Sequence, residues 1–228
     1  MKVAILGAGN IARSMAEAIN GLDDSVEAYA VAARDLERAE AFAQKWGFQK
    51  AYGSYEEMAA DPQVDLVYIA TPHSHHYAHA KMCIEHGKAV LCEKAFTMNA
   101  AQAKELIAFA EEKKVLLTEA IWTRYMPSRK MIDDVVASGV IGKITSLSAN
   151  LGYVMADKER MKRPELAGGA LLDLSVYPIN FASMVFGDKI ERIEASCTKI
   201  ETGVDAQDSI TIYFQDGKVA FLYTTMVA

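Results

Sequence analysis

A glycine-rich turn near the start of the chain constrains its fold more than any other feature. Residues 3–6 form an apolar, strand-like run, and the string GAGNIA that follows opens a helical pattern at residues 11–20. In this context the first glycine permits a tight turn, the second lets the backbone approach a pyrophosphate, and the small last residue lets helix and strand pack closely. The helix N-terminus then faces the anion. We therefore expect a dinucleotide to bind at Gly7, Gly9, Asn10, Ile11 and Ala12; the alternative is a tight turn without a ligand.

The rest of the first half continues this alternation of strand and helix. Apolar or β-branched runs at residues 26–33, 66–70, 89–92 and 115–118 alternate with helical patterns at 36–46, 75–86 and 100–113. Such alternation is typical of βαβ units around a parallel sheet. The predicted fold class is α/β, with a Rossmann domain over residues 1–120.

The second half has a different pattern, which predicts a separate α+β open-sheet domain over residues 121–228. Helical patterns at 128–138 and 169–186 flank a strand at 143–154 and a charged segment at 157–165, and long strands follow at 190–201, 208–215 and 218–226. Because the last strand stops without a turn, we expect the sheet to be incomplete and this strand to leave an open edge. Its apolar residues Phe221, Tyr223 and Met226 then need a cover, for example a partner.

Composition narrows the classes of partner. The chain carries 24 Lys and Arg against 30 Asp and Glu, a net charge of −6, and lacks a basic block, which argues against nucleic-acid binding and favours a small-molecule substrate. Cys83, Cys92 and Cys197 lack CxxC spacing, as expected for a reducing, cytoplasmic setting. The start does not resemble a signal peptide, and no apolar run approaches the ~20 residues of a membrane span, so no membrane partner is expected.

The residue that ends the second strand bears on the choice of cofactor. NAD sites usually place an acid there for the ribose 2′-hydroxyl, whereas this strand ends at Arg34. A guanidinium suits a 2′-phosphate, so NADP is favoured over NAD. Asp35 leaves dual use open, and an exposed Arg34 paired with Asp35 or Glu37 is the simpler alternative.

All five histidines follow the third predicted strand, on the side where an open parallel sheet binds its ligand. His75 and His79 have i,i+4 spacing, but no HExxH, CxxC or converging carboxylate accompanies them, so no metal site is expected. Cofactor contacts are the better interpretation, and the candidates are Thr71, Pro72, His73 and His76.

The fourth strand delivers Glu93 and Lys94 at its carboxyl end, where the catalytic groups of such sheets collect. An ammonium group there can hydrogen-bond a reacting oxygen or stabilise an ionised tyrosine nearby. Taken alone, the two residues are more often an ion pair at a strand end.

Five segments together resemble the glucose–fructose oxidoreductase, inositol dehydrogenase and MocA family: GAGNIA, TPHSHH, LCEKA, EAIWTRY and GGALLDLSVYPINF. The last segment has a tyrosine, Tyr177, where the family has histidine or tyrosine, and in this it resembles the dihydrodiol dehydrogenase branch. The resemblance implies that Lys94 is catalytic, that Tyr177 is the acid/base on the substrate oxygen, and that Asp173 orients the substrate. It places Trp122 and Arg124 beside the nicotinamide.

The resemblance also implies a homodimer and hydride transfer between NADP and a hydroxyl-bearing carbon of a trans-dihydrodiol or an aldose such as xylose. An NAD-linked inositol or amino-sugar dehydrogenase and a non-catalytic nucleotide sensor stay open as alternatives. Without the family, Asp173 and Tyr177 are equally well explained as a partly buried polar pair.

Two departures from the family affect these expectations. Ala95 stands where the family has proline after the lysine, which puts the placement of Lys94 in doubt. Family members also continue for about a hundred further residues, so we expect this chain to be a fragment in which cofactor binding is better supported than turnover.

Overall fold

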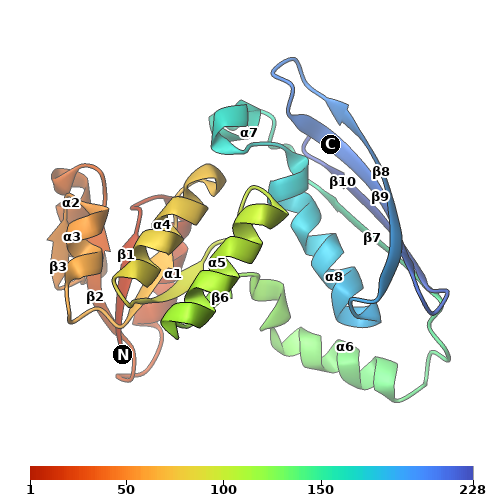
Figure 1. The fold of residues 1–228 in the computed structure, drawn as a ribbon, viewed down its shortest axis with the longest axis horizontal. Coiled ribbons are helices and arrows are strands. Elements are labelled where there is room, and N and C mark those ends of the chain that lie inside the picture. The colour runs from red at the N-terminus through yellow and green to blue at the C-terminus, as the bar shows by residue number, and fades with distance from the viewer. Residues whose placement is uncertain (228) are drawn as a thin grey trace. The chain divides into compact units, whose positions relative to one another are not determined.

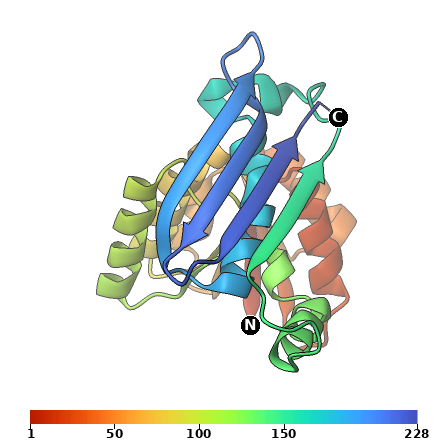
Figure 2. The same ribbon diagram turned by 90° about the vertical axis from the view of Figure 1, so that its right-hand side faces the viewer.

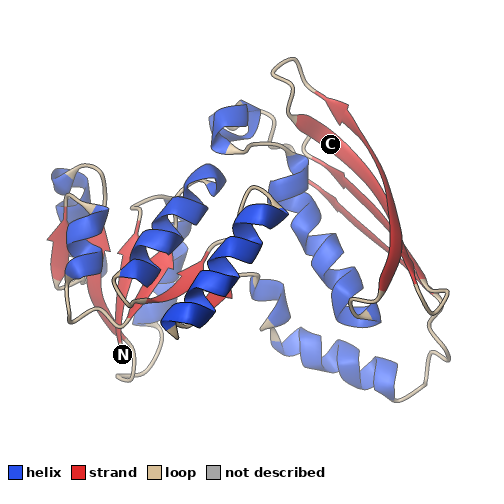
Figure 3. Ribbon diagram, viewed as in Figure 1, coloured by secondary structure: helices blue, strands red, loops and turns tan. Residues whose placement is uncertain are grey.

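The computed structural model describes residues 1–227 and divides into two compact units, which meet in sequence between Ala120 and Ile121. The first unit is a parallel α/β sheet and the second a mixed sheet with helices. The predicted fold class is therefore confirmed. Figure 1 labels the elements of both units, and Figure 3 separates their helices from their strands.

The first unit alternates strands and helices along its whole length. Its sheet has the order β3-β2-β1-β4-β5-β6, with every pair of strands parallel. Because the order reverses between β1 and β4, the carboxyl ends of these strands form the crevice where open α/β sheets bind ligands. The elements are β1 (Lys2–Leu6), α1 (Asn10–Asn20), β2 (Glu27–Ala32), α2 (Leu36–Trp46), β3 (Lys50–Tyr52), α3 (Tyr55–Ala60), β4 (Leu66–Ile69), α4 (His73–Glu85), β5 (Ala89–Cys92), α5 (Ala100–Lys113) and β6 (Leu117–Glu119).

Helices cover both faces of this sheet, as the alternation along β1 shows. Val3 and Ile5 pack in one buried cluster with side chains of α1 and α2, whereas Ala4 and Leu6 pack in another with side chains of α3, α4 and α5. A strand buried on both faces needs a continuous apolar run, which is what residues 3–6 supply. The helix that follows the glycine-rich turn packs closely because Ala12 is fully buried.

Two short elements of this unit were missing from the sequence prediction. Strand β3 has three residues, none of them fully buried, and α3 has six. Neither is long enough to establish a periodic pattern, so tertiary packing decides them. The prediction also began the histidine helix too late, since α4 starts at His73.

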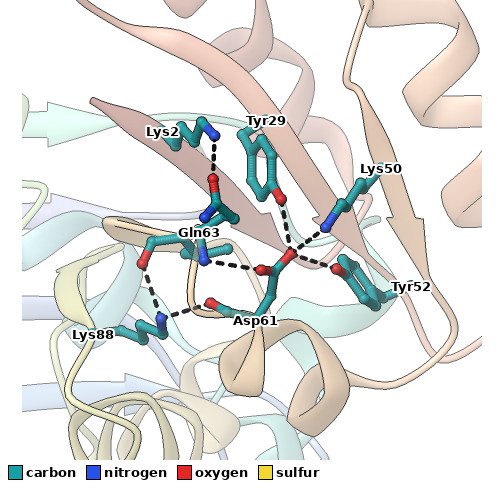
Figure 4. A network of polar contacts seen from close by, with 8 residues as sticks. Lys2, Tyr29, Lys50, Tyr52, Asp61, Gln63 and Lys88 are labelled. Atoms are coloured by element: carbon teal, nitrogen blue, oxygen red, sulfur yellow. Dashed lines mark hydrogen bonds and ion pairs between the residues drawn. The ribbon is translucent and has the colours of Figure 1, made fainter.

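A buried carboxylate, Asp61, ties together strands β2 and β3 (Figure 4). Oδ2 of Asp61 accepts hydrogen bonds from Tyr29 Oη at 3.0 Å, Tyr52 Oη at 2.6 Å and Lys50 Nζ at 2.8 Å. Burial opposes ionisation of this group, but these donors and the backbone N–H of Gln63 outweigh it and hold the pKa of Asp61 well below its usual range.

The main chain of the same segment is held by a buried lysine. Lys88 Nζ donates to the carbonyl oxygens of Asp61 at 2.6 Å and Val64 at 3.0 Å. This network lies at the edge of the sheet opposite the carboxyl ends, so we assign it to stability and not to ligand binding.

The second unit builds a four-stranded sheet with the order β7-β10-β9-β8, in which β7 and β10 are parallel and the other pairs antiparallel. Figure 2 shows this sheet face-on, with α8 behind it. Ala182 and Phe186 of α8 pack against Ile210, Ile212 and Phe214. The elements are η1 (Trp122–Arg124), α6 (Pro127–Ala137), β7 (Ser146–Gly152), α7 (Glu159–Lys162), η2 (Pro164–Leu166), the π-helical turn η3 (Leu171–Ser175), α8 (Val176–Phe186), β8 (Ile190–Lys199), β9 (Asp205–Phe214) and β10 (Val219–Thr225).

The expectation that the last strand forms an open edge is wrong. Strand β10 pairs with β9 on one side and with β7 on the other, so β7 and β8 are the edges. The long connection from β7 through α8 brings β7 beside the last strand, which the sequence order does not reveal. Met226 is fully buried, whereas Phe221 and Tyr223 are exposed.

One helical segment, Pro164–Phe186, is long and apolar enough by length and composition to cross a membrane, contrary to the sequence expectation. The core helix of a globular domain passes the same test. Here 44% of the most apolar window is buried inside the structure, and α8, its second half, packs on the sheet. Packing therefore accounts for its apolar character.

Candidate active site

The glycine-rich turn has the geometry of a phosphate cradle. Gly7 adopts a φ of +104°, and a Cβ there would lie 3.1 Å from the carbonyl oxygen of Ala70, so a side chain is excluded. Gly9 caps α1 without a side-chain hydrogen bond, and a Cβ on it would meet only the Ala70 oxygen, at 3.9 Å. Asn10 and Ile11 at the start of the helix are exposed. The N–H of Gly7 donates to the carbonyl oxygen of Ala32 at 2.9 Å, whereas the exposed N-terminus of α1 can face an anion, so the turn fits a dinucleotide pyrophosphate.

Two arginines lie beyond the carboxyl end of β2. Arg34 is exposed and forms no ion pair within residues 1–227, while Asp35 is engaged as the cap of α2, accepting the N–H of Glu37 at 3.0 Å. Arg38 Nη2 donates to the carbonyl oxygen of Ala8 at 2.8 Å.

Tyr55, the first residue of α3, lies near these two arginines. Burial raises the pKa of Tyr55, against the opposing positive charges of Arg34 and Arg38. Tyr55 therefore lies near both guanidinium groups, beyond the carboxyl end of β2. The sequence did not predict Arg38, because its contact with Ala8 joins residues 30 positions apart and no local pattern marks it.

The start of α4, which carries the histidines, joins two backbone loops at the carboxyl ends of β4 and β5. His76 is fully buried, with Nδ1 2.8 Å from the carbonyl oxygen of Ala95 and Nε2 2.8 Å from that of Thr71. Burial lowers the pKa of His76, despite the opposing effect of the two carbonyl oxygens. This side chain joins the loop after β4 to the loop after β5. Of its neighbours, Pro72 caps α4, and His73 is buried with its ring centroid 5.7 Å from that of His76.

A second histidine is held close to the same loop. His79 Nδ1 lies 3.0 Å from Thr71 Oγ1, and the ring meets Tyr55 edge-on at 4.9 Å. Burial lowers the pKa of His79 to about 4, so the ring is uncharged at neutral pH. Among residues 1–227, no group of three or more His, Cys, Asp or Glu side chains is arranged to hold a metal ion.

The loop that carries Lys94 is fixed by carboxylates at the ends of β5 and β6. Glu93 accepts a hydrogen bond from the hydroxyl of Tyr68 and another from the N–H of Lys94 at 3.2 Å. Glu119 accepts the N–H of Phe96 at 2.9 Å. Burial raises the pKa of Glu93, although Tyr68 and Lys94 oppose that effect. The peptide bond between Lys94 and Ala95 is cis.

In the second unit, Tyr177 lies in the first turn of α8 and contacts the segment that follows β6. Trp122 Nε1 donates to the Tyr177 hydroxyl at 3.0 Å. Arg124 donates to Asn180 Oδ1 at 2.5 Å and to Ser183 Oγ at 3.3 Å. The resemblance places Trp122 and Arg124 beside a nicotinamide, and within this unit both side chains also bind α8.

Asp173 belongs to the π-helical turn before Tyr177 and is almost fully buried. Both of its carboxylate oxygens accept from Arg160 Nη2, at 3.1 and 3.0 Å. The pairing supports the simpler interpretation from the sequence, a buried polar group satisfied by neighbours. Arg160 was not predicted, because the charged segment that contains it resembles a solvated loop.

A hollow of about 270 Å³ lies beside Tyr177 within the second unit. It opens between α6, α8 and β7, and its walls are mainly apolar. Met126, Ile132, Leu151, Phe181 and Met184 supply most of the apolar surface.

A model of the GFO/IDH/MocA oxidoreductase family, NAD-binding Rossmann fold, matches residues 1–121, and a model of the GFO/IDH/MocA C-terminal domain matches residues 130–228. The chain belongs to this family. The GFO/IDH/MocA assignment agrees with the resemblance drawn from the five sequence segments, and the NAD-binding Rossmann fold that it describes includes the turn with Gly7 and Gly9.

Curated members of the GFO/IDH/MocA family resemble the chain over most of its length. Trans-1,2-dihydrobenzene-1,2-diol dehydrogenase from Mus musculus is 42% identical over 219 residues, which cover 95% of this chain and 66% of the mouse protein. The Homo sapiens protein of that name is 46% identical over 187 residues, covering 82% of this chain and 55% of its own. The chain thus spans about two thirds or less of these relatives.

Solved structures resemble the chain over its whole length. A 3-ketoreductase from Actinomadura kijaniata in complex with NADP and TDP-benzene has a TM-score of 0.93 at 28% identity, covering 100% of this chain and 70% of the other. GenD2 from gentamicin A biosynthesis, in complex with NAD, has a TM-score of 0.92 at 25% identity, covering 100% and 66%.

Proposed function

We propose that the protein is an NADP-preferring dehydrogenase of a small polar substrate, a trans-dihydrodiol or an aldose such as xylose. The observation that carries the proposal is Lys94, held at the carboxyl end of β5 in a family of NAD-binding oxidoreductases. A cation fixed there suits the oxygen of a carbon that gains or loses a hydride. The dihydrodiol dehydrogenase relatives support the substrate class.

The proposed preference for NADP rests on Arg34, the exposed guanidinium group after β2. Arg34 has no ion-pair partner in the part of the chain that the structure describes, and Asp35 is occupied as a helix cap. Arg34 offers guanidinium donors for a ribose 2′-phosphate, whereas Asp35, the acid that could accept from a ribose 2′-hydroxyl, already caps α2 through Oδ1. Neighbours in the family are known with either cofactor.

The proposed reaction divides its roles between the cofactor and the chain. The nicotinamide supplies the hydride chemistry when bound. Tyr177 exchanges a proton with the substrate hydroxyl, and Lys94 stabilises the charge on that oxygen. Asp173 positions the Tyr177 helix through Arg160 in this scheme, because its carboxylate is buried and paired.

A substrate panel tests the function. Trans-dihydrodiols and aldoses are assayed with NADP and with NAD, beside the variants Lys94→Ala, Tyr177→Phe and the double variant. We expect each single change to lower kcat by roughly 10² or more, because proton transfer by a positioned group contributes about that much. The double variant should be far from additive if both act in one step. Near-normal kcat in Tyr177→Phe contradicts the acid/base role.

Two further proposals concern the setting. A homodimer is supported by the uncovered face of the second sheet, where Phe221 and Tyr223 are exposed. A reducing, cytoplasmic compartment is supported by the three cysteines, all of which are free.

A further inference from the structure

We propose that Trp122 is a positioning residue for Tyr177, directing its hydroxyl hydrogen away from the indole and toward the reacting oxygen. The inference rests on the proposed acid/base role of Tyr177, and the contact itself can be tested without turnover. Indole nitrogen carries a hydrogen and accepts none, so it can only donate. Across the 3.0 Å contact, the Tyr177 oxygen must therefore be the acceptor.

The direction of this hydrogen bond matters for proton transfer. Because the Tyr177 hydroxyl accepts from Trp122, its own hydrogen must point to another acceptor, and this hydrogen is the proton that Tyr177 would transfer. After the proton has left, the indole still donates to the oxygen, and the bond becomes charge-assisted. A serine or tyrosine hydroxyl at position 122 could either donate to Tyr177 or accept from it, whereas an indole can only donate.

The rings add a second constraint. Their centroids are 5.9 Å apart with an interplanar angle of 65°, the edge-to-face arrangement that aromatic pairs favour. Trp122 is 54% exposed, and none of the residues of η1 is buried. Burial in a core therefore does not explain why the indole lies where it does, and its contact with Tyr177 does.

The three-residue turn that carries Trp122 is itself fastened to the same helix. Arg124 reaches Asn180 and Ser183, which lie three and six residues beyond Tyr177 on α8. Asn180 in turn donates to the carbonyl oxygen of Val176 at 3.1 Å, next to Tyr177. The turn is thus hydrogen-bonded to α8 at Tyr177, Asn180 and Ser183, and Trp122 makes the bond to the proposed catalytic oxygen.

The contact is tested first by NMR on the full chain. The protein has two tryptophans, so labelled protein gives two indole N–H resonances, and Trp46→Phe assigns them. Tyr177→Phe removes the acceptor and should move the Trp122 resonance toward the position of a solvent-bonded indole while the Trp46 resonance stays in place. An unchanged Trp122 resonance overturns the proposal, whatever the substrate proves to be.

The functional arm uses Trp122→Phe, which keeps an aromatic ring and loses the donor, and Trp122→His, which restores an N–H. With the substrate identified by the panel, Trp122→Phe should lower kcat about tenfold, the loss expected for one hydrogen bond. KM and the NADP Kd should change less than about twofold, and the solvent deuterium isotope effect on kcat should rise. Trp122→His should recover part of kcat, and the matched control Trp46→Phe should leave it unchanged.

The outcomes separate the two claims. If wild-type protein oxidises no dihydrodiol or aldose, the proposed function fails and the NMR result alone decides the contact. If wild-type protein is active but Trp122→Phe keeps kcat within about twofold, the positioning role is wrong. Equal losses in Trp122→Phe and Trp122→His also overturn it, because ring packing and not the donor would then be responsible.

Discussion

Arg38 donates a 2.8 Å hydrogen bond to the carbonyl oxygen of Ala8, which joins the first turns of α2 to the glycine-rich turn. This contact gives Arg38 a different task from that of Arg34, which is exposed after β2. In the proposed scheme, Arg38 supports the turn that any dinucleotide would use, and Arg34 selects a 2′-phosphate. The two variants should therefore separate affinity from preference.

We expect Arg34→Ala to abolish a preference for NADP that is at least about tenfold in the wild type, a difference of ~1.4 kcal/mol. Arg38→Met should weaken NADP and NAD binding alike, because it loosens the turn as well as removing a cation. Calorimetric titration with both cofactors measures this, with Lys45→Met at the far end of α2 as the control. Equal wild-type affinities for NADP and NAD would refute the preference.

The Asp61 network predicts a pH-dependent stability. Asp61→Asn should lower the free energy of unfolding by about 1–3 kcal/mol at neutral pH, since an amide cannot accept from all the donors that surround the carboxylate. The pKa of Asp61 is lowered by folding, so its contribution is complete above the unfolded value of about 3.9 and is lost as the pH falls toward the folded value.

Urea unfolding from pH 7 downward checks this expectation. The difference between wild type and Asp61→Asn should stay constant down to about pH 5 and shrink below about pH 4. Asp24→Asn in an exposed loop of the same unit is the matched control. A difference that persists unchanged in acid would mean that packing, and not the charge, is responsible.

Glu119 should matter because it holds the loop that carries Lys94. Glu119→Ala removes the acceptor for the N–H of Phe96 and should lower kcat about tenfold or more, with little change in the NADP Kd. Glu119→Gln keeps a carbonyl oxygen in place and should retain more activity. Steady-state kinetics beside cofactor titration measure both, and equal losses in the two variants would show that the charge matters and not the hydrogen bond.

A double-mutant cycle tests whether Arg160 and Asp173 act as one unit. Arg160→Met and Asp173→Asn should each destabilise the protein, with a coupling energy of roughly 1–2 kcal/mol, because each change removes an ion pair to an almost fully buried carboxylate. The exposed pair Arg163 and Glu165 should show little coupling in the same assay. If Asp173→Asn instead raises KM and leaves stability intact, the carboxylate contacts substrate after all.

Much of the first unit follows from local pattern. The bounds of α2, β5 and α5 agree with the predicted ranges, because both helices begin after a capping side chain, Asp35 or Asn99, and β5 is a short apolar run between turn residues. The roles of Gly7 and Ala12 were also predictable, since backbone conformation and close packing allow few other residues. Arg34 was identifiable for the same reason, by its place at a strand end.

The remaining site residues depend on contacts between distant segments. Arg38 meets a carbonyl 30 positions away, and Glu119 meets an N–H 23 positions away, so no local pattern marks either residue. His76 was expected to bind a ligand, whereas its buried ring also joins two backbone loops. The edge of the second sheet was misassigned for a related reason, because strand order is set by the pairing of β7 with β10.

The last prediction concerns the uncovered face of the second sheet. Phe221 is 50% exposed and Tyr223 is 40% exposed, and both alternate along β10 with Leu222, which is buried on the α8 side. On the neighbouring strand, Tyr213 is the partner of Val219 and lies on the same side as Phe221. A row of aromatic side chains on one face of a mixed sheet is the kind of exposed patch that marks a protein interface.

We expect the chain to associate through this face. Sedimentation velocity or light scattering should find a dimer in the wild type, and Phe221→Glu should shift it to monomer, because a buried unpaired carboxylate costs several kcal/mol. The control Val140→Glu places the same charge on another exposed apolar residue, 77% exposed in the loop after α6, and should leave the dimer intact. A wild-type protein that is monodisperse and monomeric at high concentration would refute the homodimer, and dissociation by Val140→Glu alone would move the interface from the sheet to the α6 side of the unit.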